Sequence, residues 1–408
     1  MKKFWDKWTE IALVKRILVG LILGAILGIA VPQATGIAIL GDVFVSALKA
    51  IAPLLVFFLV ISSLCNAGKS HGGVIKTVII LYMFSTVLAA VIAVFASMAF
   101  PVKMTLANAA TDTSAPQGIV EVLNNLLLNV VANPVSSLVN ANYVGILMWA
   151  VLLGLAFRVA DKMTKKVLAD VADGISMVVT WIINLAPFGI FGLVFNTVST
   201  NGLDIFTTYG KLLLLLVGCM LFIYFVTNPL LVYWCIRQNP YPLIFHCLKR
   251  SALTAFFTRS SAANIPVNMK VCEEMGLDRD TYSVTIPLGA TINMDGAAIT
   301  ITVMTMATAF TLGIHVDIPT AIILSLLAAL SACGASGVAG GSLLLIPMAC
   351  SLFGISDDIS MQVVAVGFII GVVQDSVETA LNSSSDLLLS ASAEFRQWRL
   401  EGKEIKFK

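Results

Sequence analysis

Residues 282–313 read YSVTIPLGATINMDGAAITITVMTMATAFTLG, an apolar stretch with Asn293, Asp295 and Gly296 near its middle. A helix that crosses a bilayer needs about 20 residues of this kind, so the stretch is long enough to span. A carboxylate at that depth is costly and is usually partnered and functional. The Asn-Met-Asp-Gly sequence also favours a break in the helix, which frees backbone carbonyls. We therefore expect an oxygen-rich site for a hard cation at this point.

The composition of the whole chain indicates an integral membrane protein. Of its 408 residues, 58% are apolar and only 12% are charged, and the mean hydropathy is +0.95. An ordinary soluble domain carries roughly 25% charged residues. So few charges cannot cover a water-exposed surface of this size. The composition excludes a disordered chain, a nucleic-acid-binding domain and an ordinary cytosolic enzyme.

Apolar runs of spanning length recur along the chain. The uninterrupted candidates are 12–31, 43–64, 74–100, 142–160, 167–198 and 211–236, with a further apolar piece at 119–131 ahead of Asn133-Pro134. The later segments 243–268, 282–313, 320–350 and 360–391 are apolar but contain polar or glycine-rich clusters. In the first span, Gly20, Gly24 and Gly28 favour close contact with another helix.

The distribution of Lys and Arg predicts the orientation, because these residues gather on the cytoplasmic side. With a cytoplasmic N-terminus and alternating sides, 21 of the 25 basic residues fall inside, in the connections 2–16, 69–76, 158–166, 237–250, 270–279 and 396–408. This distribution holds only if 243–268 and 320–350 each enter and leave on one side. We expect an all-α integral membrane protein with eight transmembrane helices, two re-entrant helical hairpins and both termini cytoplasmic.

Two polar clusters suit the tips of these hairpins. Residues 258–266 read TRSSAANIP, and residues 334–342 read GASGVAGGS. Non-helical backbone at membrane depth is tolerated only inside protein or beside a wet cavity. In the first cluster serines can satisfy freed backbone groups and Pro266 limits helix continuation, while the glycines of the second allow a gate to open. The alternative is that both clusters are small-residue surfaces for helix packing.

The last apolar segment carries polar residues at helical spacing. Asp375, Glu378, Thr379, Asn382 and Asp386 lie at offsets of 0, 3, 4, 7 and 11. These offsets place all five on one helix face. Outside the bundle there is only lipid, so this face is expected to point towards the protein interior.

The two halves of this region resemble each other, since each has a hairpin followed by a span with Asn and Asp near its middle. Inverted repeats with binding at discontinuous segments near the midplane are typical of secondary transporters. The chain has no phosphate-binding loop of the Walker A type, so ATP is not the expected energy source.

These motifs resemble the dicarboxylate/amino acid:cation symporter family, the family of the glutamate transporters. The resemblance covers essentially the whole chain and is most specific between 258 and 386. Within the family, the chain is most similar to the bacterial members that carry serine and threonine with sodium.

The resemblance implies a glutamate-transporter-like fold assembled as a homotrimer in the bacterial inner membrane. Residues 1–240 would form mostly scaffold, with the third span contributing to the transport core. Residues 241–395 would form that core, which moves by an elevator motion, and 396–408 a cytoplasmic tail. The implied partners are a small neutral amino acid, sodium and lipid, with no nucleic acid and no cofactor beyond the co-transported sodium.

The resemblance also implies the residues that bind sodium. A deep site would take Tyr82, Ser85, Thr86, Asn293 and Asp295. A second would take Asp386 with carbonyls of Gly289, Asn293 and Asn382. A third would take Thr291 with carbonyls of the second hairpin.

The implied substrate site comprises residues of both hairpins and of the two binding spans. They are Arg259, Ser260, Ser261, Ala297, Gly337, Val338, Asp375, Glu378, Thr379 and Asn382. Asp375 would meet the α-ammonium, with Thr379 nearby, and Ser261 and Asn382 the α-carboxylate.

Two departures from the acidic-amino-acid transporters indicate the substrate class. Those transporters carry an Arg where this chain has Glu378, and a Thr where it has Ala297. A carboxylate substrate would meet like charge at Glu378, so we expect a small neutral amino acid such as serine or threonine. Arg259 is placed to pair with Glu378 or with Asp375.

Other functions remain open at this point. The same fold could carry acidic amino acids or dicarboxylates, or couple to protons through the acidic stripe. A membrane aspartyl protease would use Asp295 with Asp375 or Asp386, although nothing in the sequence shows two of these acids meeting. A channel would have a similar polar lining.

Overall fold

The computed structural model describes residues 13–66, 73–106, 131–202, 204–333 and 340–405, and the single residues 11, 128 and 335. The expected apolar piece at 119–131 therefore lies almost wholly outside the described residues. Over the described ranges the chain is helical and contains no strand. Six helical stretches are long and apolar enough to cross a membrane, namely Thr35–Ser62, Gly73–Ala99, Lys162–Asn184, Phe206–Ile236, Arg279–Thr311 and Asp357–Leu400. The chain is an all-α, multi-pass membrane protein.

The described helices have the following bounds. In chain order they are α2 (Leu13–Ala30), α3 (Ile39–Asn66), α4 (Gly73–Ala99), α6 (Pro134–Val139), α7 (Tyr143–Ala156), α8 (Lys162–Asn184), α9 (Ala186–Asn201), α10 (Asp204–Phe222), α11 (Asn228–Ile236), α12 (Tyr241–Cys247), α13 (Leu253–Thr258), α14 (Ser261–Glu274), α15 (Arg279–Ile292), α16 (Asp295–Thr311), α17 (Ile318–Ala332), α18 (Ile346–Ser351) and α19 (Asp357–Leu400).

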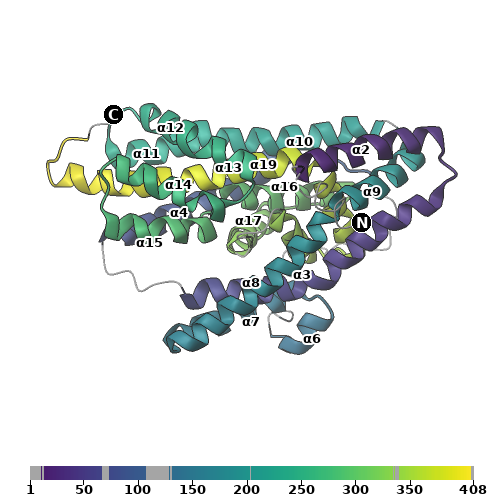
Figure 1. The fold of residues 1–408 in the computed structure, drawn as a ribbon, viewed down its shortest axis with the longest axis horizontal. Helices are drawn as coiled ribbons and strands as arrows, with labels where there is room; N and C mark the ends of the chain where they lie inside the picture. The colour runs from purple at the N-terminus through teal and green to yellow at the C-terminus, as the bar shows by residue number, and fades with distance from the viewer. Residues whose placement is uncertain are drawn as a thin grey trace.

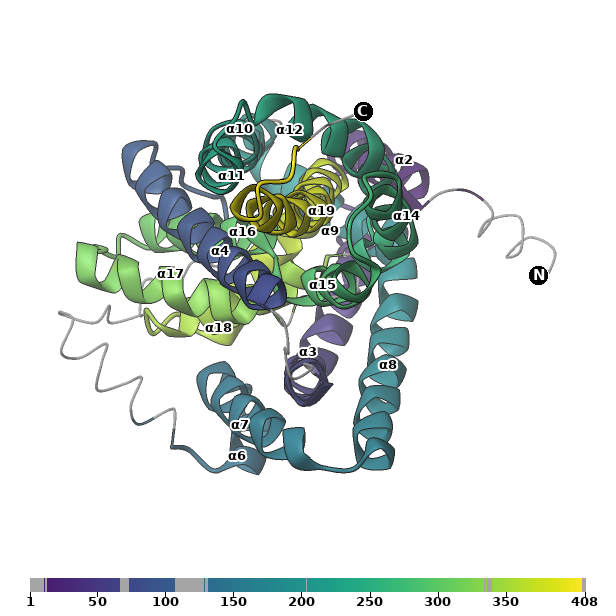
Figure 2. The ribbon, with the colours of Figure 1, turned by 90° about the vertical axis from the view of Figure 1, so that its left-hand side faces the viewer.

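The described helices pack in two groups (Figures 1 and 2). In one group, α2 and α3 pack against α9, and α3 also packs against α7 and α8. In the other, the long helix α19 is surrounded by α4, α10, α11, α13–α16 and α18. Figure 2 shows α7 and α8 standing apart from the bundle around α19. The five polar positions predicted on one face of the last span therefore lie on the central helix, where all five are buried.

The contact between α2 and α9 depends on glycine. A Cβ added at Gly20 would lie 2.2 Å from the Pro187 carbonyl oxygen, and one at Gly24 would lie 2.6 Å from that of Phe191. Such distances leave no room for a side chain, so the two backbones approach each other directly. The close helix contact predicted from this glycine spacing is confirmed.

The apolar run 167–198, expected as one uninterrupted span, is divided in the structure between α8 and α9 at Leu185. Pro187 lies in the first turn of α9, where its missing N–H costs nothing. Inside a continuous helix the same proline would remove a backbone hydrogen bond and clash with the preceding turn. The chain therefore ends one helix and starts another at this point.

Two helical hairpins lie beside α19. The first turns between α13 and α14, and the second is formed by α17 and α18. In the first, Asn264 of α14 donates from Nδ2 to the Ser251 hydroxyl across 2.9 Å, which brings together the two sides of the turn at Arg259–Ser260. In the second, the Ser331 hydroxyl of α17 contacts Met348 Sδ of α18 at 3.4 Å. Pro266 lies inside α14 and does not end it, so the expectation that it limits the helix is wrong.

The break predicted at Asn-Met-Asp-Gly is confirmed. The helix α15 ends at Ile292 and α16 begins at Asp295, and Asn293 and Met294 between them have non-helical backbone angles. This break lies against the middle of α19, because the Gly296 N–H donates to the Asn382 side chain there.

Candidate functional site

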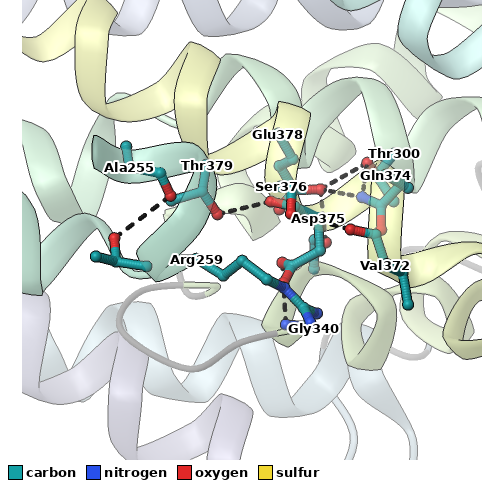
Figure 3. A network of polar contacts seen from close by, with 12 residues as sticks. Ala255, Arg259, Thr300, Gly340, Val372, Gln374, Asp375, Ser376, Glu378 and Thr379 are labelled. Carbon is teal, nitrogen blue, oxygen red and sulfur yellow. Dashed lines mark hydrogen bonds and ion pairs between the residues drawn. The ribbon is translucent and has the colours of Figure 1, made fainter. Parts of the chain in front are cut away.

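Asp375 on α19 connects the turns of both hairpins (Figure 3). Arg259 at the first turn has a left-handed backbone (φ 52°), and its Nε donates to Asp375 Oδ2 at 2.6 Å. The backbone N–H of Gly340, just before α18, donates to Asp375 Oδ1 at 3.1 Å. The Arg259 and Asp375 side chains are only 11% and 5% exposed. Both oxygens of one carboxylate therefore hold the two turns together, and Arg259 pairs with Asp375 rather than Glu378.

Glu378 lies one turn further along α19, and three groups donate to one of its oxygens. The Thr300 hydroxyl of α16 reaches Oε2 at 2.7 Å, and the Ser342 hydroxyl reaches it at 2.9 Å. Gln374 donates to it from Nε2 at 2.5 Å. The other oxygen, Oε1, makes no hydrogen bond with any described residue. Glu378 is thus fixed through Oε2, while Oε1 receives no hydrogen bond from the part of the chain that the structure describes.

The helices α15 and α16, which the break at Asn293 and Met294 separates, are called the broken helix below. Gly296 allows this broken helix to pack directly on α19. Its N–H donates to Asn382 Oδ1 at 2.7 Å. A Cβ at this position would lie 2.9 Å from both Cα and Cγ of Glu378. The next residue, Ala297, is completely buried. Because Gly296 and Ala297 are small, α16 with Asp295 can lie close to α19 with Glu378.

Asp295 is the centre of a first group of oxygen atoms. The Ser85 hydroxyl of α4 donates to its Oδ2 at 2.7 Å, and the Thr86 hydroxyl donates to its Oδ1 at 3.1 Å. The N–H of Met294 also donates to the Thr86 hydroxyl, at 3.3 Å. All of the side chains that contact Asp295 are fully buried.

Asp386 is the centre of a second group. Asn293 donates from Nδ2 to Asp386 Oδ1 at 2.9 Å, and the Tyr82 hydroxyl donates to the Asp386 backbone carbonyl at 2.9 Å. A Cβ on Gly289 would lie within 2.9 Å of both Asp386 and the Tyr82 hydroxyl. Among the described residues, Tyr82 and Asn293 therefore donate to Asp386, whereas Ser85 and Thr86 donate to Asp295.

Asp295 and Asp386 are both buried without a cationic neighbour among the described residues. Among the described residues, no Lys, Arg or His side chain lies within ion-pair distance of Asp295 or Asp386. The carbonyl oxygen Asn293 Oδ1 is also buried without a hydrogen-bond partner there. Buried charges are normally paired or bound to a cation. Carboxylate, hydroxyl and amide oxygens are the ligands that a hard cation prefers, so these residues fit one.

The other expected site residues have local contacts. The Ser260 hydroxyl accepts from the N–H of Ala263 and so caps α14, while Ser261 is buried at the start of that helix. The Thr379 hydroxyl donates to the Asp375 carbonyl, and that of Thr291 donates to the carbonyl of Leu288. Gly337 and Val338 lie outside the described residues.

The residues that fix Glu378 are not among the site residues predicted from the sequence. Gln374 lies four residues before Glu378 on the same helix, a spacing that brings two side chains together. Thr300 lies among apolar residues of α16, where only the fold shows its direction. A second missed cluster joins the first hairpin to α19, since Asn264 and Asn268 donate to the hydroxyl and carbonyl of Ser383 at 2.8 Å each.

Known proteins resemble this chain over nearly its full length. A family model described as the sodium:dicarboxylate symporter family matches residues 13–394. A protein of Bifidobacterium adolescentis named serine/threonine transporter SstT is 58% identical over 401 residues, 98% of this chain and 93% of the relative. Proteins of the same name from Streptococcus thermophilus and Streptococcus agalactiae are 55% identical over 400 residues and 57% identical over 395 residues. Those alignments cover 98% and 97% of this chain and 100% and 98% of the relatives.

Both the family and these relatives are transporters, which makes the chain a transporter and not an enzyme. The match to the family model extends over nearly all of the chain, from the start of α2 to Glu394 in the last part of α19. The chain belongs to the sodium:dicarboxylate symporter family.

Proposed function

We propose that this protein is a symporter that imports serine and threonine together with sodium. The observation that carries the substrate class is the surroundings of Glu378. Its oxygen Oε2 accepts three hydrogen bonds, while Oε1 accepts none from the described residues. A substrate hydroxyl is a donor, so the side chain of serine or threonine can donate to Oε1.

The charges at the site support a neutral amino acid over an acidic one. Arg259 balances Asp375, whereas the described contacts of Glu378 are with uncharged groups. A substrate with a second carboxylate would meet Glu378 where few water molecules screen the repulsion. The ammonium of any amino acid is the group suited to Asp375, and it would take the place of the Arg259 guanidinium there. The names of the relatives support serine and threonine in particular.

Coupling to sodium is supported by the groups around Asp295 and Asp386. They bring carboxylate, hydroxyl and amide oxygens together without a cationic side chain among the described residues. Sodium bound at these residues would balance the buried charge and stabilise the contact between α4, the broken helix and α19. The proposed third ion, beside Thr291, would involve residues that the structure does not describe.

We further propose that the two helix groups are the scaffold and the transport core. The first would contain α2, α3 and α7–α9. The second would contain α4 and α10–α19, with the hairpins α12–α14 and α17–α18 re-entering the membrane between eight spans. This assignment departs from the expected domains, in which α10 and α11 belonged to the scaffold, because both helices pack against α19. Movement of the second group against the first would expose the site alternately to each side. The same proposal includes a homotrimer in the inner membrane with both termini cytoplasmic.

The test is uptake of labelled L-serine by proteoliposomes that contain the purified protein. We expect accumulation with an inward sodium gradient, no accumulation with choline in place of sodium, and competition by L-threonine. L-aspartate is expected to compete poorly.

Each result has a defined meaning in this assay. If accumulation persists with choline and follows an imposed proton gradient, uptake is coupled to protons and not to sodium. If L-aspartate competes strongly and L-threonine does not, the substrates are acidic and not neutral amino acids. Vesicles without protein provide the background.

A further inference from the structure

The helix formed by α10 and α11 changes its geometry beside the Asp295 group. Between the two helices, Ile223–Thr227 form a wider π turn, in which the N–H of Asn228 donates to the Ile223 carbonyl. Pro229 has no N–H and cannot donate to the Phe225 carbonyl one turn earlier. The Tyr241 hydroxyl donates to that carbonyl instead, at 3.3 Å. Wide turns of this kind occur frequently at functional sites.

Asn228, at the end of this turn, is completely buried next to Ser85. Its Oδ1 lies 3.5 Å from the Ser85 hydroxyl, whereas that hydroxyl lies 2.7 Å from Asp295 Oδ2. A hydroxyl has one hydrogen to donate, and the shorter distance shows that Asp295 receives it. Asn228 Nδ2 is buried and has no hydrogen-bond partner in the described part of the chain. A buried amide with so few hydrogen bonds is costly and needs an explanation.

We propose that Asn228 is a positioning residue of the cation site at Asp295, a role that rests on the sodium coupling proposed above. Sodium held by Asp295 and Ser85 would occupy a lone pair of the Ser85 oxygen. The hydroxyl hydrogen must then turn away from the ion and from the carboxylate that binds it. Asn228 Oδ1 is the acceptor on that side, and the hydroxyl turns from Asp295 to Asn228 as the ion binds.

The local backbone determines where the Asn228 amide lies. The π turn and Pro229 set the direction of Asn228, and the Tyr241 hydroxyl satisfies the carbonyl that Pro229 leaves without a donor. Without Asn228, the Ser85 hydrogen would be buried with no acceptor whenever sodium is bound. Asn228 thereby favours the sodium-bound state while touching neither the ion nor the amino acid.

The test measures sodium binding and not transport. The full-length protein in detergent is titrated with sodium chloride against choline chloride, without amino acid, and its melting temperature is followed. The variants are Asn228→Leu, Asn228→Asp, Ser85→Ala and the Ser85→Ala/Asn228→Leu double variant. Asn228→Ala replaces Asn228→Leu if leucine prevents folding.

We expect Asn228→Leu to raise the half-stabilising sodium concentration about tenfold, because one buried hydrogen bond is lost from the bound state. Asn228→Asp keeps an acceptor oxygen for the Ser85 hydrogen and adds a charge that attracts sodium, so it should not raise the half-stabilising sodium concentration above that of the natural protein. In the Ser85→Ala background, Asn228→Leu should add nothing, because the two residues act through one hydrogen.

Two results would overturn the role of Asn228 alone. One is sodium stabilisation of Asn228→Leu equal to that of the natural protein, and the other is full additivity in the double variant. A natural protein that sodium does not stabilise at all would instead overturn the proposed sodium coupling, and the role of Asn228 with it.

Discussion

Arg259 and Asp375 form a buried ion pair that lies between the two hairpin turns, with Nε and Oδ2 2.6 Å apart. The same chain has an exposed counterpart, Arg250 with Glu274, whose side chains are 40% and 39% exposed. Breaking a buried pair leaves one charge without a partner or water, whereas an exposed pair contributes little. The two pairs allow the role of the buried one to be measured against a matched control.

Replacing Arg259 with alanine should destabilise the protein without substrate by about 3 kcal/mol, since Asp375 stays buried and unpaired. Binding of L-serine should restore much of this loss, because its ammonium then supplies the missing charge. The measurement is the melting temperature with and without saturating L-serine. The shift that L-serine produces is expected to be larger in the variant than in the natural protein.

The control for this experiment is Arg250→Ala, which should change stability by less than about 1 kcal/mol and leave the effect of L-serine unchanged. Equal serine-induced shifts in Arg259→Ala and the natural protein would show that the ammonium does not replace the guanidinium at Asp375.

Glu378→Gln should weaken the discrimination between serine and aspartate. The substitution keeps the size of the side chain and removes the charge that repels a second carboxylate. We expect the ratio of the inhibition constants of L-aspartate and L-serine to fall about tenfold, which corresponds to about 1.4 kcal/mol. The measurement is competition against uptake of labelled L-serine, with Glu273→Gln on the exposed face of α14 as the control. An unchanged ratio would mean that Glu378 does not select the substrate by charge.

Gly296→Ala tests the contact between the broken helix and α19. Its Cβ would lie 2.9 Å from the Cα of Glu378, so the two segments must separate. Overpacking of this kind typically costs about 1–3 kcal/mol, and serine binding should weaken as well. Gly218→Ala is the matched control, because a Cβ at that helical glycine meets nothing within 4 Å. The stability of both variants is measured by thermal unfolding. Equal stability would show that α19 can move away from the added methyl group without a loss of stability.

Local periodicity was enough to predict the central features of the site. The spacing of Asp375, Glu378 and Asp386 predicted one buried helix face, and the structure places all three on α19 with at most 5% exposure. The helix break at Asn293 was predictable because Asn, Asp and Gly disfavour a continuous helix in an apolar run. Both features depend on residues close together in the sequence.

Features that depend on distant residues were not predictable in the same way. The sequence allowed Arg259 to reach Glu378 or Asp375, and only the arrangement of the hairpins on α19 decides for Asp375. The direction of the Asn293 amide towards Asp386 is set by packing across 93 residues of sequence. Asn228 had a local signal, an Asn-Pro pair in an apolar span, but its neighbour Ser85 lies on a different helix.

Asp386→Asn should lower the affinity for sodium while leaving the fold in place. The substitution preserves the shape of the side chain, and the Tyr82 hydroxyl can still donate to the backbone carbonyl of residue 386. The lost negative charge removes the strongest attraction for a cation in this group, since no other carboxylate contacts Asn293 among the described residues. We expect the sodium concentration for half-maximal serine uptake to rise at least about tenfold. Asp317→Asn is the matched control, because Asp317 caps α17 at the protein surface and asparagine caps helices equally well. A normal sodium requirement in Asp386→Asn, with a raised one in Asp295→Asn, would place the coupling ion at Asp295 alone.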